Sequence, residues 1–487
     1  MKIRVIALLT LCCATFASAS ATDSTTGRSQ TAGIQAGIVI SGEIADEATI
    51  IAEEPDAAIA ATMATEKELY IPERVNRVPE GNDYNDDESD YSFSRMIQSA
   101  NIAVFWHKEY GSDPLKDPAE NKRFDAKAIL DECERFYNYY IDVMKFTEKG
   151  MSLTDKYKML VYVYGGDGGT AFGGGSEEKV GIMWTPSSRV RRAPYAVMAH
   201  EMVHAFQYIS RIDAGTGPRG AISEMAAQYH LWQVYPEWMT FENYHLVDFM
   251  KKTHFAFLHS TNMYHSPYVL EYWSYKRGID YYGRLSRETR TDEDPVMTYK
   301  RMYSLTQEQF NDEMFDACRR FITWDLPRIR EVAAPYANQH HTSLIADSDG
   351  WYRIPPENCP QNYGYNGIRL NIPKAGTRVR LQFEGIAGTG GYNAVNTDKA
   401  GWRYGFVAYL KDGSRVYGDI LRDAQGKATF RVPKETEYLW LVVSGAPTEH
   451  WPVPARRGAA SGETMEEQWP YKFKLSGTTP DDSVIRQ

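Results

Sequence analysis

The chain has 487 residues, of which 43% are hydrophobic and 24% are charged, and its formal net charge is −10. This composition supports sizeable buried cores and excludes a chain that is disordered or fibrous as a whole. The acidic balance argues against a nucleic-acid partner, because phosphate contacts need concentrated lysine and arginine.

The first residues predict an export signal. Lys2 and Arg4 precede an apolar run over 5–16, and the small residues 17–21 offer cleavage sites. We expect a signal peptide over residues 1–21 and a protein that is secreted, periplasmic or held at the cell surface. No later run of about 18 apolar residues appears, so no transmembrane segment is expected.

Residues 22–91 are rich in alanine, threonine, serine and acids, and they end in the polar run 82–90. Such a composition buries too little apolar surface to offset the entropy of the chain, so we expect a disordered, low-complexity segment. A propeptide that covers an active site until it is cleaved is the alternative. Order is expected from Ser92 onward.

Residues 92–343 are predicted to form a mixed α and β domain. Short apolar runs bounded by turn residues predict strands at 101–106, 159–164 and 180–184. Helical spacing of apolar residues predicts helices at 124–146, about 194–210, about 221–234, and several more up to residue 326. Thr306 with Gln309 forms a capping-box pattern at the start of the last of these helices.

Beyond Leu344 the apolar period changes from helical to alternating, and the Asp412–Gly413 pair predicts a tight turn between two strands. Several short strands at this spacing predict a β-sandwich over residues 344–487. Its aromatic residues are either core residues or a surface that stacks on sugars: Trp402, Tyr404, Tyr409 and Trp440. The expected fold class is therefore α+β, a catalytic domain with a small N-terminal sheet followed by a β-sandwich.

Three cysteines follow the predicted signal, Cys133, Cys318 and Cys359. Their wide separation excludes a local zinc ribbon, and three cysteines do not make a disulfide framework. One disulfide with one free thiol stays possible in an oxidising compartment.

The segment 195–208 contains the pattern His-Glu-x-x-His within a predicted helix. At about 100° per residue, His200 and His204 lie about 40° apart on one face, so both imidazoles can reach one zinc ion. Glu201 lies about 100° round from His200, where a carboxylate can take a proton from water at the metal.

Glu224 is the predicted third ligand, 20 residues after His204. The glycine-rich turn over 215–220 lets a second helix fold back against the first. Two histidines and one glutamate leave an open tetrahedral position, which is typical of catalytic rather than structural zinc sites. The alternative is a histidine pair and a solvated acid without a metal.

With these residues in place, the sequence resembles the gluzincins, the thermolysin-like branch of the zinc metallopeptidases. The resemblance covers residues 159–229, and more loosely a secreted bacterial family of uncharacterised proteins over 92–447. It implies a zincin-like catalytic domain in which His200, His204 and Glu224 bind Zn²⁺ and Glu201 is the general base. Thermolysin-like enzymes usually have Asn before the ligand Glu and Asp four residues after it. Here Ser223 and Gln228 stand at these positions, so that orienting carboxylate is absent or comes from elsewhere.

The same resemblance implies a Tyr or His downstream that donates to the developing oxyanion. His265 is our first choice and Tyr264 the second, whereas Tyr268, Tyr272 and Trp273 are expected to be helix-packing residues. The other histidines of this region are expected to be ordinary packed or exposed residues: His245, His254 and His259.

The loop over 165–175 holds seven glycines and lacks the Gly-Lys-Ser/Thr that a phosphate-binding loop requires. It is either a flexible hairpin connection or a place where the backbone of a substrate comes close to an edge strand.

We therefore predict a secreted zinc-dependent endopeptidase acting on a protein or glycoprotein substrate. Two alternatives stay open: a zinc peptidase specific for glycosylated proteins, and a non-catalytic extracellular binding protein that retains the zincin fold. The sequence predicts neither the cleavage specificity nor the oligomeric state.

Overall fold

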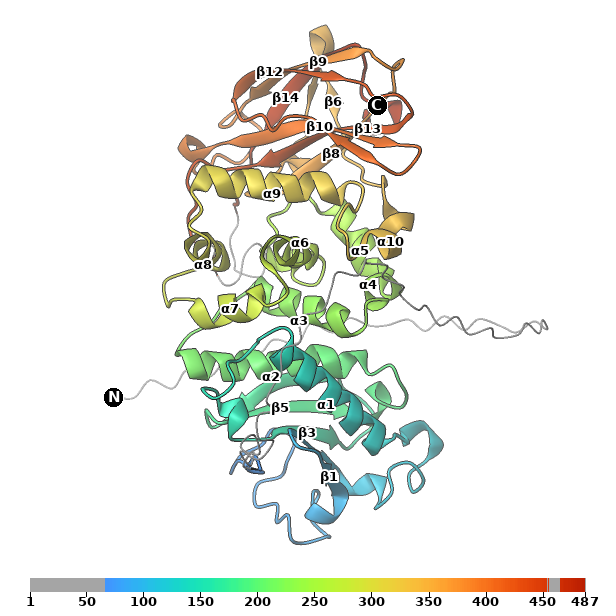
Figure 1. The fold of residues 1–487 in the computed structure, drawn as a ribbon, viewed down its shortest axis with the longest axis vertical. Coiled ribbons are helices and arrows are strands. Elements are labelled where there is room, and N and C mark those ends of the chain that lie inside the picture. The colour runs from blue at the N-terminus through green and yellow to red at the C-terminus, as the bar shows by residue number, and fades with distance from the viewer. Residues whose placement is uncertain (1–65, 453, 455–464, 487) are drawn as a thin grey trace, which may run out of the picture. The chain divides into compact units, whose positions relative to one another are not determined.

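The computed structural model describes residues 66–452, 454 and 465–486. The predicted signal peptide and residues 22–65 lie outside this range. The described residues form one compact unit of mixed α and β structure, in which three sheets are present (Figure 1). No helix in the described part of the chain has the length and apolar character needed to cross a membrane.

A five-stranded sheet of order β1-β2-β3-β5-β4 forms the N-terminal part. Strands β2, β3 and β5 run parallel, and β1 and β4 flank them as antiparallel edges. The bounds are β1 Met96–Gln98, β2 Ile102–Trp106, β3 Met159–Tyr164, β4 Phe172–Ser176 and β5 Val180–Pro186. The three predicted strands are confirmed as β2, β3 and β5.

The side chains of β3 alternate between two cores, because the sheet is covered on both faces. Val161 and Val163 pack with helices α1 (Ala126–Asp142) and α2 (Ala196–Ala214). Leu160 and Tyr162 pack on the other face, against residues of the segment 66–91.

The expectation of disorder up to Tyr91 is wrong for residues 66–91. Val75 and Tyr91 are buried there, and Leu69 packs beside them. These sparse apolar residues are enough, because they cover a strand face that is itself fully apolar. The segment lies on the face of the sheet away from α2, so its described part does not cover the helix with the His-Glu-x-x-His motif.

Eight helices of the described chain follow α2 and share its core. Their bounds are α3 Ala221–Val234, α4 Trp238–Phe241, α5 Asn243–Lys251, α6 Tyr268–Arg277, α7 Tyr281–Glu288, α8 Pro295–Met302, α9 Gln307–Phe321 and α10 Arg330–Ala333. The predicted capping box is present at α9, where Thr306 and Gln309 exchange side-chain to backbone hydrogen bonds.

Two antiparallel sheets form the C-terminal part, with strand orders β11-β10-β13-β8 and β12-β9-β14-β7-β6. A shared apolar core lies between them, in which Phe383 and Tyr404 stack at 4.0 Å between ring centroids. This is the predicted β-sandwich. The bounds are β6 Ile345–Ala346, β7 Trp351–Arg353, β8 Tyr365–Leu370, β9 Arg378–Gly385, β10 Trp402–Leu410, β11 Arg415–Tyr417, β12 Gln425–Arg431, β13 Thr436–Gly445 and β14 Tyr471–Ser476.

The four-stranded sheet also packs against the helices. Trp440 belongs to the helical core, and the buried Arg403 pairs with Glu308 and Asp312 of α9 at 2.7 and 2.6 Å. Residue 344 therefore marks a change of secondary structure rather than a break in packing.

The proposed sugar-stacking surface is not formed by three of its four residues. Trp402, Tyr404 and Trp440 are 3%, 0% and 0% exposed, so they are core residues. Tyr409 is partly exposed and lies under the guanidinium of Arg415.

Cys133, Cys318 and Cys359 are all free and buried. No disulfide joins the described cysteines, and burial raises the pKa of each of these thiols above its ordinary value.

Candidate metal centre

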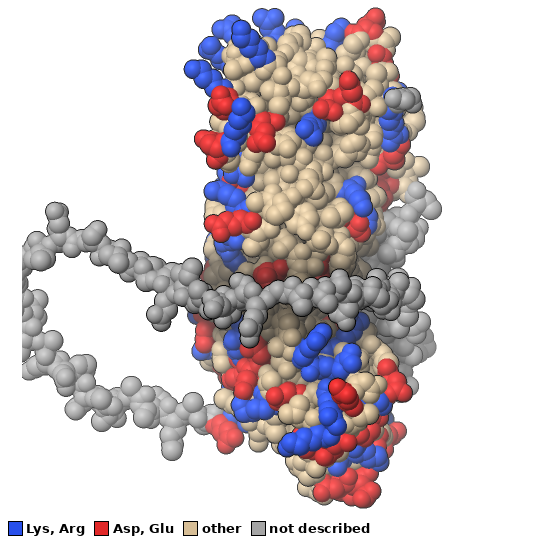
Figure 2. Space-filling model, turned by 90° about the vertical axis from the view of Figure 1, so that its right-hand side faces the viewer, with Lys and Arg blue, Asp and Glu red and all other residues tan. Residues whose placement is uncertain are grey.

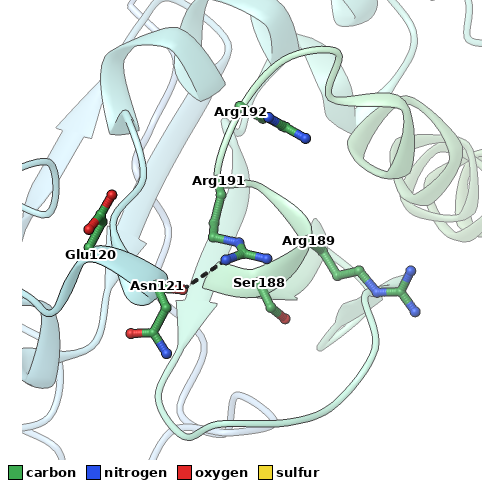
Figure 3. A pocket seen from close by; sticks show the side chains of 6 residues that line it. All are labelled: Glu120, Asn121, Ser188, Arg189, Arg191 and Arg192. Atoms are coloured by element: carbon green, nitrogen blue, oxygen red, sulfur yellow. Dashed lines mark hydrogen bonds between the residues drawn. The ribbon is translucent and has the colours of Figure 1, made fainter. Parts of the chain in front are cut away.

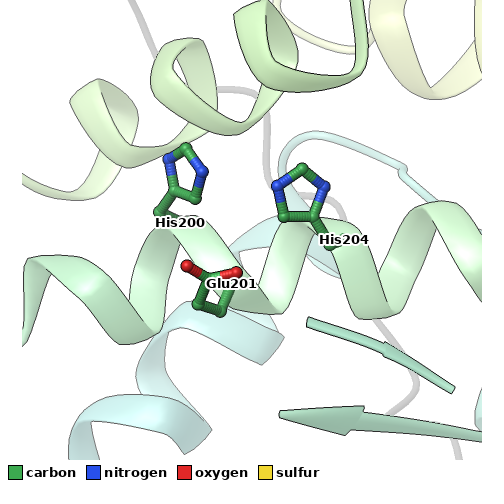
Figure 4. A group of neighbouring side chains, drawn as sticks. All are labelled: His200, Glu201 and His204. Atoms are coloured by element: carbon green, nitrogen blue, oxygen red, sulfur yellow. The ribbon is translucent and has the colours of Figure 1, made fainter. Parts of the chain in front are cut away.

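Helix α2 presents its two motif histidines away from the sheet. Met198, Met202 and Phe206 are buried in the core beneath the helix. Figure 4 shows the rings of His200 and His204 on one side of α2 and the carboxylate of Glu201 on another. The apolar arc of the helix thus fixes which way the polar side chains face.

Two glycines let the edge strand β4 lie directly against α2. A Cβ atom at Gly173 would lie 2.0 Å from the backbone oxygen of Glu201, and one at Gly175 would lie 2.2 Å from the ring of Tyr208. The glycines therefore make room for the helix. The outer edge of β4 pairs with no other strand in the described chain.

Glu224, in the first turn of α3, reaches both motif histidines. Its Oε2 lies 3.2 Å from Nε2 of His200 and 3.3 Å from Nε2 of His204. Two ligands about 2.1 Å from a tetrahedral ion lie about 3.4 Å apart. Both Oε2–Nε2 distances are close to this value, and two imidazoles with one carboxylate are donors that zinc prefers, so the residues fit a zinc ion.

The three side chains of this cluster are partly exposed to solvent. The side chains of His200, His204 and Glu224 keep 14%, 16% and 26% of their surface exposed. Glu201 is 8% exposed, and its carboxylate lies within 4.8 Å of ring nitrogens of the two histidines. The Glu201 carboxylate therefore lies next to the cluster of His200, His204 and Glu224.

Opposite charges stabilise each other in this cluster. Burial favours the neutral ring of His204, but the hydrogen bond and charge of Glu224 and the charge of Glu201 raise its pKa to about 9. Burial also disfavours the carboxylate of Glu224, yet hydrogen bonds with both histidines hold its pKa well below the ordinary value. Without a metal, the carboxylate is therefore an anion between two imidazoles.

Gln207 orients the ring of His204, a contact that the sequence analysis missed. Its Nε2 donates to the backbone oxygen of Ser223 at 2.9 Å, so its Oε1 is the acceptor that faces Nδ1 of His204 at 2.9 Å. In the neutral ring Nδ1 therefore carries the proton, and Nε2 is the nitrogen available to a metal. The spacing of three residues between His204 and Gln207 on one helix is the sequence signal that could have indicated this contact.

Tyr264 lies next to a motif histidine, whereas His265 does not contact one directly. The ring of Tyr264 stacks at 6.5 Å from that of His200 and at 6.2 Å from that of His245. His265 reaches the site through His245, since the two Nδ1 atoms are 3.1 Å apart. His245 was expected to be an ordinary packed residue and instead lies between these groups.

The remaining predicted positions are also clear. Gln228, at the position where thermolysin-like enzymes have the orienting Asp, contacts Nε2 of His245 at 3.3 Å. His259 pairs with Glu466 at 3.1 Å, and His254 stacks on Phe255. Tyr268, Tyr272 and Trp273 are fully buried packing residues, as expected.

Sequence comparison identifies a family. The family described as "Family of unknown function (DUF6055)" matches residues 61–482. The chain belongs to this family. No curated protein shows significant similarity to it.

Two solved structures resemble parts of this DUF6055 chain. One is the Glycosylation Associate Protein (Gap123) complex from Streptococcus agalactiae, at 12% identity and a TM-score of 0.15, covering 28% of this chain and 38% of that one. The other is the M60 catalytic domain with the CBM51-1 and CBM51-2 domains of Clostridium perfringens ZmpB. It has 11% identity and a TM-score of 0.28, covering 80% of this chain and 60% of that one. With TM-scores this low, neither similarity bears on the function of this chain.

Proposed function

We propose that the protein is a secreted zinc-dependent endopeptidase in which His200, His204 and Glu224 hold the metal. The observation that carries this proposal is the position of the Glu224 carboxylate, 3.2 and 3.3 Å from the two Nε2 atoms. Three protein ligands leave a fourth tetrahedral position for a reactant.

Glu201 is the proposed general base. His200, His204 and Glu224 would hold a zinc ion, which would supply a Lewis acid that makes water acidic near neutral pH. Glu201 lies beside the cluster, where it takes the proton from the attacking water and passes it to the leaving amine.

Tyr264 is the proposed donor to the developing oxyanion. Its ring lies next to His200, whereas His265 contacts His245 instead. Burial, with the charges of His265 and His200, lowers the pKa of His245 to about 4, so this ring is neutral near pH 7 and can also donate. A donor at this place stabilises the charge that grows in the transition state.

Strand β4 is the proposed docking edge for the substrate backbone. It is an edge strand, and Gly173 holds it against the turn of α2 that carries Glu201 and His204. An extended peptide adds to such an edge by main-chain hydrogen bonds. We propose an antiparallel arrangement, because antiparallel pairing is slightly more stable per residue.

Metal analysis and two variants test the proposal. Purified protein should hold one zinc ion and cleave unfolded proteins, and a chelator should abolish this activity reversibly. Glu201→Gln should retain zinc but lose hydrolysis, whereas His204→Ala should lose both. Hydrolysis by Glu201→Gln at the parental rate would contradict the assigned base. Stoichiometric zinc without cleavage of unfolded proteins, glycoproteins or peptide libraries would instead favour a non-catalytic binding protein.

A further inference from the structure

A cavity of about 920 Å³ lies beside the segment that links β5 to α2. Figure 3 shows its lining, with Arg189, Arg191 and Arg192 on that linking segment and Glu120 and Asn121 on a neighbouring segment, where Asn121 lies next to Arg191. The three arginines are exposed, and Glu120 contributes the one carboxylate among the lining residues. The cavity is therefore strongly basic.

Two of these guanidinium groups have unused binding capacity. Arg191 makes one long contact, 3.5 Å from Nη1 to the backbone oxygen of Asn121 (Figure 3). No carboxylate of the described chain forms an ion pair with Arg191 or Arg192, whereas Arg403 has two carboxylate partners. On the face drawn in Figure 2, acidic and basic side chains are interspersed, so basic side chains there commonly have a carboxylate nearby. A guanidinium binds a carboxylate by two parallel hydrogen bonds.

Strand polarity relates the cavity to the proposed substrate edge. Phe172 of β4 pairs with Trp184 of β5, and Pro186 ends β5 two residues later, just before the 3₁₀ helix Ser187–Arg189. A peptide antiparallel to β4 runs parallel to β5. Its C-terminal part therefore heads toward the arginines, at about 3.3 Å per residue.

The catalytic centre and the cavity also share a neighbour. Burial raises the pKa of the Glu242 carboxyl, and the charges of His200 and of Arg189 both oppose this rise. Glu242 in turn lies 3.8 Å from Nε2 of His245. Arg189 and His200 thus both lie close enough to this carboxyl group for their charges to act on it.

We infer that this cavity binds carboxylates on the C-terminal side of the scissile bond, so that the enzyme prefers acidic substrates. The inference rests on the proposed function and adds the substrate class to it. The carboxylates belong either to aspartate and glutamate side chains or to the free C-terminus of a short peptide. The test below includes a peptide for each of these two sources.

Four matched fluorogenic peptides provide the kinetic test. One carries glutamates at the second to fourth residues after the scissile bond and an amidated C-terminus. The second has glutamines there, the third has glutamines and a free C-terminus, and the fourth carries glutamates only before the bond. We expect kcat/KM at least about 10-fold higher for the first or third peptide than for the second, and a smaller ratio at high salt.

The double variant Arg191→Gln, Arg192→Gln should reduce this ratio to near one. The matched control is Arg378→Gln, Arg431→Gln, an exposed cross-strand pair of β9 and β12 in the sandwich, which should keep it. Equal kcat/KM for all four peptides, with Glu201→Gln inactive, would overturn the inference and leave the peptidase intact. Preference for the fourth peptide alone would also overturn it.

A binding measurement does not depend on turnover. Fluorescein-labelled forms of the first and second peptides are titrated with Glu201→Gln protein, and anisotropy is recorded. The acidic peptide, or the third peptide with its free C-terminus, labelled in the same way, should bind at least about 10-fold more tightly than the second. The arginine variant but not its control should lose this difference. Equal affinity of all three peptides would overturn the inference even if no peptide were cleaved. Absence of cleavage would by itself contradict the proposed function.

Discussion

The molecule contains two neighbouring pairs of histidines, which differ in how closely a carboxylate approaches them. His200 and His204 share Oε2 of Glu224 at 3.2 and 3.3 Å. His245 and His265 contact each other at 3.1 Å, but their nearest acidic oxygens, on Glu242 and Asp248, are 3.8 and 3.9 Å away.

The consequence is opposite protonation in neighbouring places. The pKa of His204 is raised to about 9, whereas that of His245 is lowered to about 4. A buried imidazole is thus protonated near neutral pH only where an anion lies within hydrogen-bonding distance. Without that anion, desolvation keeps the rings neutral, and they serve as hydrogen-bonding groups.

Removal of the carboxylate should make the first pair resemble the second. Glu224→Gln keeps the shape of the side chain, but we expect zinc affinity to fall by more than about 100-fold, beyond the usual loss for an orienting residue. Hydrolysis should be lost, and the pKa of His204 should fall to near 6.5 or below. Competition with a chromophoric chelator measures the affinity, and NMR titration of labelled histidines measures the pKa.

The matched control is Glu242→Gln, which removes the acid next to the second pair. It should retain zinc. Parental zinc affinity in Glu224→Gln would show that Glu224 is not a ligand.

The oxyanion donors can be separated in the same way. Tyr264→Phe should lower kcat by about 100-fold, the usual effect of losing one donor to the oxyanion. His265→Gln should lower it by about 10-fold or less, because His265 contacts His245 rather than a motif histidine. Steady-state kinetics with zinc content measured in parallel provide the test. A larger loss in His265→Gln would place the second histidine pair in the reaction itself.

The smallest expected effect is on the stability of the metal-free protein. The raised pKa of His204 stabilises the fold fully below about pH 6.5, and this stabilisation is lost as the pH rises through about 9. The loss is on the order of 1–3 kcal/mol. For His245 the sign is reversed, since its lowered pKa destabilises the fold as the pH falls from about 6.5 to about 4.

Urea unfolding with a chelator present, repeated across pH 4.5–9, measures both effects. Glu224→Gln should remove the alkaline loss. His245→Gln should reduce the acidic loss without removing it, because other buried histidines have lowered pKa values in the same direction: His230, His254 and His340. An alkaline loss that persists in Glu224→Gln would contradict the assigned ion pair.

Local geometry explains which parts were predictable from the sequence. Helical spacing alone places His200 and His204 together, and a glycine-rich turn brings α3 back beside them. Continuous apolar runs likewise predicted β2, β3 and β5 correctly. Each of these signals lies within a single element or two consecutive ones.

Contacts between distant elements were not predictable in this way. Tyr264 meets His200 across 64 residues, and no local pattern distinguishes His245 from the other histidines. The segment 66–91 was misjudged because its average composition hides a few well-placed apolar residues. The glycines of β4 allowed two interpretations, and the structure shows a third use, contact with α2.

The back of the N-terminal sheet limits how far the chain can be trimmed by proteases. Phe105, Tyr162 and Trp184 are buried on that face by residues that begin at Leu69. Removal of residues 69–91 would expose this aromatic surface to water, where it would attract other apolar surfaces. A chain that begins after residue 91 should therefore aggregate more readily than one that begins before Leu69.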